Sequence, residues 1–171
     1  MAEPEEHLGY YTGSRWISFA VAVLLIAIVS LWLAASLRDT EERTEKLVVE
    51  QAVRRMHMGM QLAMGEAMMQ GREREIVTWV GSNPVRWLDG DLRGYIGTCA
   101  RRETLAPGHW CFDELRSELH YHPRLNHHLR FKNSADEPLL RWRVVAKNPT
   151  AAGGLVGLHV ENVTLYEWFA E

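Results

Sequence analysis

The chain has 171 residues, of which 47% are hydrophobic and 24% are charged, and its formal net charge at pH 7 is -3. This weakly acidic balance supplies no general attraction for phosphate backbones, so we expect no nucleic-acid partner. The 134 residues after Leu37 suffice for one domain with a modest hydrophobic core.

The first predicted element is an apolar helix. Ile17–Leu37 contains twenty-one residues and no charge. A helix of that length crosses the hydrocarbon core of a bilayer, which is about 30 Å thick. A cleaved signal peptide has a shorter apolar run behind a basic segment, whereas three glutamates and only Arg15 precede this one. We therefore predict a tail over residues 1–15 and an uncleaved transmembrane helix over 16–37.

An amphipathic helix is predicted over residues 38–80. Its apolar side chains recur at spacings of four and three between Val49 and Ala67, which places them on one helix face. Six of the seven methionines lie between Met56 and Met69. Methionine adapts to irregular surfaces, so this face either packs on the domain's own sheet or binds partner proteins. The candidate partner-binding residues are Met56, Met60 and Met64.

Glycines and turn formers indicate where backbones approach and where the helix pattern stops. Gly59 and Gly65 each cost about 1 kcal/mol relative to alanine within a helix, so we expect another backbone to lie close to them. Gly81–Pro84 and the Asp89-Gly90 pair are turn signals. Residues 81–108 are accordingly predicted to be a loop.

An antiparallel β meander is predicted over residues 109–171. Short runs of β-type residues are separated there by turn formers. Leu140, Trp142 and Val144 alternate with Arg141, Arg143 and Val145, as in a strand buried on one face. A helix covering such a sheet is an α+β arrangement. The predicted strands are 109–113, 119–122, 128–132, 139–146 and 155–160, and residues 162–171 form either a last strand or a short helix.

The order of elements and three segments resemble a protein family. Type IV pilins and pseudopilins have a long N-terminal helix, half of it in the membrane and half packed on an antiparallel sheet. The segments NPVRWLDGDLRGYIG, PGHWCFDELRSELHYHP and LRFK resemble pilin-like accessory proteins of the mannose-sensitive haemagglutinin pilus and related type II secretion pseudopilins. The matching positions are Asn83, Pro84, Tyr95, Gly97, Trp110, Phe112, Asp113, Leu119 and Tyr121.

The chain departs from that family at its N-terminus. A processed prepilin has a basic leader that ends in glycine, and a glutamate at the fifth mature position. Here the leader is acidic, the nearby glycine is Gly13, the fifth residue after it is Ser18, and the apolar run contains no glutamate. The resemblance therefore implies an assembly or accessory component that stays in the inner membrane.

Two lines of reasoning disagree on which side of the membrane the domain lies. Arg15 precedes the apolar run, whereas Arg38, Arg43 and Lys46 follow it, and the positive-inside rule then puts the domain in the cytoplasm. The resemblance implies the opposite, with the N-terminal tail in the cytoplasm and the domain in the periplasm. We adopt the periplasmic orientation and a single-pass inner-membrane location.

Whether the two cysteines form a disulfide depends on which compartment holds the domain. In an oxidising compartment Cys99 and Cys111 pair and close a short loop, which is worth about 3 kcal/mol on the chain-entropy model. In the cytoplasm they stay thiols. The periplasmic orientation that the resemblance implies agrees with the disulfide.

Candidate chemistry is limited to histidines. His120 and His122 are two residues apart, so on a strand they share a face, and a third ligand nearby would make a metal site. The alternative, which we adopt, is that they are ordinary strand and loop residues and that the chain holds no metal. Nucleotide-binding, hydrolase and metalloprotease motifs do not occur, so we expect no catalytic residue, no cofactor and no small-molecule substrate.

These observations predict a non-enzymatic, inner-membrane-anchored component of type IV pilus or type II secretion assembly. Its partners are other pilin-like or assembly proteins, contacted through the helix and the sheet. The alternative is a membrane-tethered periplasmic domain that senses or binds a ligand or a metal through the histidines.

Overall fold

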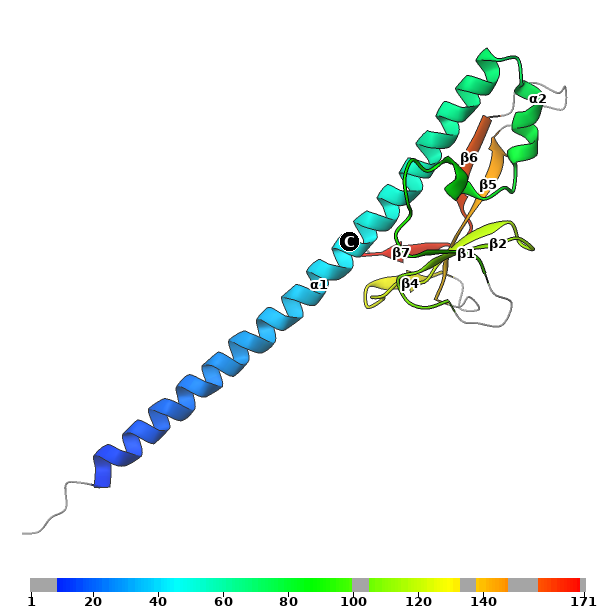
Figure 1. Cartoon of the computed structure of the whole chain (residues 1–171). Helices are drawn as coiled ribbons and strands as arrows, with labels where there is room; N and C mark the ends of the chain where they lie inside the picture. Colours follow the sequence, from blue (N-terminus) through cyan, green and yellow to red (C-terminus); the bar gives the residue numbers. More distant parts are fainter. Residues whose placement is uncertain (1–8, 100–104, 133–137, 148–156, 170–171) are drawn as a thin grey trace, which may run out of the picture. The chain divides into compact units, whose positions relative to one another are not determined.

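The computed structural model describes residues 9–99, 105–132, 138–147 and 157–169. The chain divides into two compact units, Met1–Arg43 and Thr44–Glu171. Helix α1, Gly9–Met69, begins in the first unit and ends in the second. The remaining helices and all the strands belong to the second unit (Figure 1).

The first unit consists, over its described residues, of α1 alone. Its apolar side chains are exposed: Trp16, Leu31 and Trp32 are 76%, 73% and 72% accessible. Within the described part of the chain, α1 is the one helix long and apolar enough to span a membrane. The helix begins at Gly9 rather than at residue 16, so residues 9–15 of the predicted tail are helical; residues 1–8 lie outside the described ones.

The second unit contains the end of α1, which lies at Met69 and not at residue 80 as predicted. Gly71 has φ +67°, a left-handed conformation that glycine adopts without steric cost. The Gly71 and Arg72 amides donate hydrogen bonds to the carbonyls of Met68 and Ala67, at 3.1 and 2.8 Å, which is a Schellman C-cap. After this stop come α2, Glu73–Ile76, and the 3-10 turn η1, Val77–Trp79.

A five-stranded sheet follows, and its strand order is β1-β2-β3-β5-β6. Neighbouring strands are antiparallel, except that β1 is parallel to β2. A two-stranded sheet pairs β4 with β7, so the predicted meander is interrupted between β3 and β5. The strands are β1 Tyr95–Thr98, β2 Trp110–Asp113, β3 Glu118–Tyr121, β4 Leu129–Phe131, β5 Leu140–Lys147, β6 Gly157–Asn162 and β7 Tyr166–Trp168.

The predicted loop over residues 81–108 contains two elements that the sequence did not indicate, namely η2, Pro84–Trp87, and β1. The Asn83 side chain accepts a hydrogen bond from the Val85 amide at 3.1 Å and donates one to the Tyr95 hydroxyl at 2.7 Å. Three positions of the pilin-like resemblance, Asn83, Pro84 and Tyr95, therefore shape this segment.

The hydrophobic core lies between α1 and the sheet. Along each strand, alternate side chains point to opposite faces, and those of Trp110, Leu119 and Trp142 are buried with Met56 of α1. A second cluster joins Met60 and other helix residues to the sheet. The fold is thus α+β, as predicted, with the long helix packed on a mostly antiparallel sheet.

The methionine face is part of this core. Met56 and Met60 are 0% exposed and Met64 is 4% exposed. The prediction that these three residues bind partners is therefore wrong for the folded domain, because their side chains are already covered. The other interpretation of the pattern, packing on the domain's own sheet, is the one that the structure shows.

Candidate functional site

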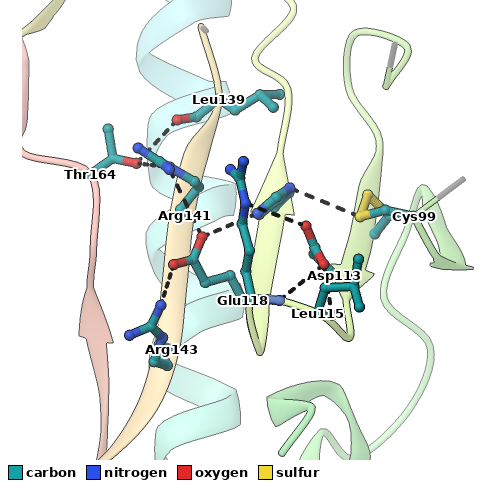
Figure 2. Close-up of polar contacts among 11 residues, drawn as sticks. Cys99, Asp113, Leu115, Glu118, Leu139, Arg141, Arg143 and Thr164 are labelled. Carbon is teal, nitrogen blue, oxygen red and sulfur yellow. Dashed lines mark hydrogen bonds and ion pairs between the residues drawn. A yellow bond between two sulfur atoms is a disulfide. The ribbon is translucent and has the colours of Figure 1, made fainter. Parts of the chain in front are cut away.

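Polar side chains gather on the face of the sheet that α1 does not cover. Cys111 of β2 pairs in register with His120 of β3, and His120 pairs with Arg141 of β5. Glu118 and Arg143 lie on the same face, since each is two residues from a member of that row. We call Cys99, Cys111, Glu118, His120, Arg141 and Arg143 the polar cluster. Figure 2 labels Cys99, Glu118, Arg141 and Arg143 among them.

The Glu118 carboxylate is the centre of the polar cluster. The residue is 3% exposed, and burying a carboxylate is costly unless cations and hydrogen bonds compensate it. Arg143 Nη2 donates to its Oε1 at 2.5 Å, Arg141 Nη1 lies 3.9 Å from its Oε2, and His120 Nε2 lies 3.3 Å from that same oxygen. Both carboxylate oxygens are therefore engaged.

The two arginines differ in how they are held. Arg141 Nε donates to the Thr164 hydroxyl at 3.2 Å, and that hydroxyl donates to the Leu139 carbonyl at 3.2 Å (Figure 2). Arg143 Nε is buried and has no hydrogen-bond partner among the described residues. Arg141 is thus tied to the chain on two sides, whereas Arg143 is held by its bond to Glu118.

His120 lies between Glu118 and a sulfur atom. Burial lowers the pKa of His120 below its ordinary value, and it outweighs the hydrogen bond and the negative charge of Glu118, which raise it. Because a carboxylate only accepts, His120 Nε2 carries the hydrogen of the neutral ring. The other ring nitrogen, Nδ1, then presents its lone pair toward Cys99 Sγ, 3.9 Å away.

Cys99 and Cys111 form a disulfide between the end of β1 and β2. The two sulfurs and a ring nitrogen of His120 lie within 4.8 Å of one another. His122, the other histidine singled out by its spacing, does not belong to this group, and its Nδ1 is in contact with the Leu105 carbonyl oxygen instead. The structure therefore brings together one of the two candidate histidines and both cysteines.

Sequence reasoning did not single out Glu118, Arg141 or Arg143 as residues of a site. A signal was present, because Glu118 and His120 share one period-two face, as do Arg141 and Arg143. What the sequence lacked was the pairing of β3 with β5, which places opposite charges side by side.

Comparisons of the chain with protein-family models, with curated proteins and with solved structures give no match. The fold and the site define the chain as an α+β protein whose N-terminal helix is long and apolar enough to span a membrane. Its domain carries a buried ion-pair cluster beside a disulfide on the outer face of the sheet.

Proposed function

We propose that this chain is a non-enzymatic, inner-membrane-anchored component of type IV pilus or type II secretion assembly. Its N-terminal tail lies in the cytoplasm and its domain in the periplasm, where it contacts pilin-like or assembly proteins through helix and sheet surfaces. One observation carries the proposal: a single helix, α1, contains both the uncharged apolar run and the segment on which the β domain is built.

The outward face of α1 in the second unit supports contact with another helix. Met58, Leu62 and Met69 are 64%, 76% and 85% exposed. With Gly65 between the last two, they recur at spacings of four, three and four, which is the period of a helix-packing seam. A Cβ added at Gly65 would meet no atom of the described residues within 4 Å, which favours the approach of a partner helix there. We call Met58, Leu62, Gly65 and Met69 the outer seam.

The disulfide supports the periplasmic side. Disulfides persist in oxidising compartments and are rare in the cytoplasm, and the Cys99–Cys111 bond joins neighbouring strands of the folded domain. The larger number of Lys and Arg residues after the apolar run than before it favours the opposite orientation, with the domain in the cytoplasm.

Orientation is tested with single reporter cysteines in the full chain with Cys99→Ser and Cys111→Ser. Leu115 is 76% exposed in the turn after β2, so Leu115→Cys reports on the domain, and Ser14→Cys reports on the tail. A membrane-impermeant maleimide applied to bacteria with a permeabilised outer membrane should label Leu115→Cys, and should label Ser14→Cys only after lysis. The reverse pattern would contradict the proposal.

The function is tested by deleting the gene in its own bacterium and restoring it in variant forms. Deletion should abolish surface pili or secretion of the proteins that depend on the type II system, and wild type should restore it. Leu62→Glu, in the outer seam, should restore less than Gln51→Glu, which changes another exposed residue of the same helix. If neither pili nor secretion changes on deletion, the proposal fails.

The second candidate is a membrane-tethered domain that binds a ligand or a metal. The observation that favours it is the group formed by Cys99, Cys111 and His120. If deletion abolishes pili or secretion, and the Cys99→Ser and His120→Gln variants restore them in full, the result favours the first candidate over the second.

A further inference from the structure

We propose that reduction of the Cys99–Cys111 disulfide converts the cluster of Cys99, Cys111 and His120 into a binding site for one Zn²⁺ ion. Two thiolates and an imidazole are ligands that zinc takes readily, and three protein ligands with a water in the fourth position is a known coordination set. The ligand atoms already lie within 4.8 Å of one another. This inference concerns the chemistry of the domain and does not rest on the proposed role in assembly.

The backbone already places the three ligands. Cys99 directly follows β1, Cys111 lies in β2 and His120 in β3, and Cys111 and His120 are register partners. Zinc bonds of about 2.3 Å to sulfur and about 2.0 Å to nitrogen put tetrahedral ligand atoms roughly 3.5–3.8 Å apart. Cys99 Sγ and His120 Nδ1 are 3.9 Å apart. Once the sulfur–sulfur bond is broken, the two sulfurs need only rotate apart.

The imidazole has the tautomer that a metal requires. His120 Nε2 is held by the Glu118 carboxylate at 3.3 Å, and Nδ1 is left with its lone pair toward the sulfurs. A carboxylate behind a ligating histidine is the usual outer partner in zinc sites, since it fixes the ring and increases its basicity. Arg143 and Arg141 in turn hold Glu118.

The disulfide alone does not account for this arrangement. A disulfide needs neither an imidazole nitrogen beside it nor a buried carboxylate behind that ring, yet His120 is 7% exposed and Glu118 is 3% exposed. Asp113 does not belong to the group, and its Oδ1 accepts hydrogen bonds from the Leu115 and Arg116 amides. The described residues thus offer three ligands, and we assign the fourth position to a water molecule.

The conversion balances with a dithiol as the reductant. The dithiol gives two electrons and two protons to the Cys99–Cys111 bond and becomes a disulfide itself, leaving two cysteine thiols. Zn²⁺ then displaces the two thiol protons as the thiolates bind, and His120 contributes its neutral Nδ1. The disulfide and the zinc site exclude each other, because both need the same two sulfur atoms.

The test uses the full chain in detergent micelles. The protein is reduced without oxygen by a resin-bound dithiol, which is filtered off, and is titrated with Co²⁺ as a visible probe for Zn²⁺. We expect thiolate-to-cobalt charge-transfer absorption that saturates at one ion per chain and disappears when Zn²⁺ is added. Oxidised protein should give no such absorption.

Matched variants assign the ligands. His120→Gln should weaken Zn²⁺ binding by at least about tenfold, and Glu118→Gln by about 10- to 100-fold. His122→Gln, two residues along the chain and outside the cluster, should leave the affinity unchanged. Equal affinities in the His120 and His122 variants would overturn the proposal, as would reduced wild-type protein without the cobalt absorption.

A readout on the wild-type chain covers the case in which a variant fails to fold. In reduced protein, Zn²⁺ should slow alkylation of Cys99 and Cys111 by iodoacetamide, measured by peptide mass spectrometry, at least about tenfold, since bound thiolates are not free nucleophiles. Alkylation at the same rate with and without Zn²⁺ would refute the site.

Discussion

The Tyr121 hydroxyl of β3 donates a hydrogen bond of 2.7 Å to Glu45 Oε1 of α1, across 76 positions of the chain. The same carboxylate accepts the backbone amides of Arg124 and Leu125, at 2.7 and 3.2 Å. One side chain of the helix thus holds both β3 and the segment that follows it. Burial and this hydrogen bond raise the pKa of Tyr121, so the phenol stays a donor at neutral pH.

Removing that hydroxyl should destabilise the domain. Tyr121→Phe should lower the free energy of unfolding by about 1.5–3 kcal/mol, the range for a hydrogen bond to a charged group. Tyr95→Phe is the matched control, because its hydroxyl accepts from the neutral Asn83 amide and its loss should cost only about 0.5–1.5 kcal/mol. Urea unfolding followed by tryptophan fluorescence measures both, and a larger loss for Tyr95→Phe would contradict the ranking.

Two glycines of α1 should respond in opposite directions to alanine. A Cβ at Gly59 would lie 1.9 Å from the Trp87 carbonyl oxygen, whereas at Gly65 it would meet no atom within 4 Å. Gly59→Ala should therefore lower the free energy of unfolding by about 1–3 kcal/mol, despite the better helix propensity of alanine.

Gly65→Ala, in contrast, should raise the free energy of unfolding by up to about 1 kcal/mol, because it gains propensity without a clash. The same urea titrations compare the two variants. Equal effects would mean that η2 does not hold the Trp87 carbonyl against the helix.

The domain should lose stability at alkaline pH through Tyr166. Burial, and secondarily the charge of Glu50, raise the pKa of this phenol to about 12 from an ordinary value of 10.0. The folded state therefore binds the proton more tightly than the unfolded state. The resulting stability is fully present below pH 10 and is lost as the pH rises from about 10 to about 12.

Tyr166→Phe should weaken that loss, since it removes the titrating group. Wild type and variant are compared by urea unfolding at pH 8 and pH 11, and the difference between their free energies of unfolding should change between the two. A difference that is the same at both pH values would show that Tyr166 does not titrate across this range.

Reduction should destabilise the metal-free domain. On the chain-entropy model the Cys99–Cys111 link, with a sequence separation of 12, is worth about 3 kcal/mol. A phosphine reductant in the presence of a chelator should lower the urea midpoint of the wild type and leave that of a Cys99→Ser, Cys111→Ser variant unchanged. A reductant effect of equal size in both proteins would exclude the disulfide as its source.

Local patterns sufficed for much of the fold. The lack of charge over Ile17–Leu37 indicated the apolar part of α1, and the four-three spacing indicated its buried face. Alternation of apolar residues with arginines over Leu140–Val144 located β5, because a strand with one buried face alternates. The close backbone approach at Gly59 was predicted and is confirmed; at Gly65 it is wrong, since only open space lies there.

Sequence patterns are therefore informative about local features: where the chain is apolar enough for a membrane, and which residues share one face of a helix or strand. The tertiary structure alone decided which strands pair. The short strand β1 became visible only beside β2, and β4, although predicted as a strand, was not expected to leave the meander and pair with β7. The cluster around Glu118 arises because β2, β3 and β5 lie side by side, and pairing between distant segments has no periodic signature along a single chain.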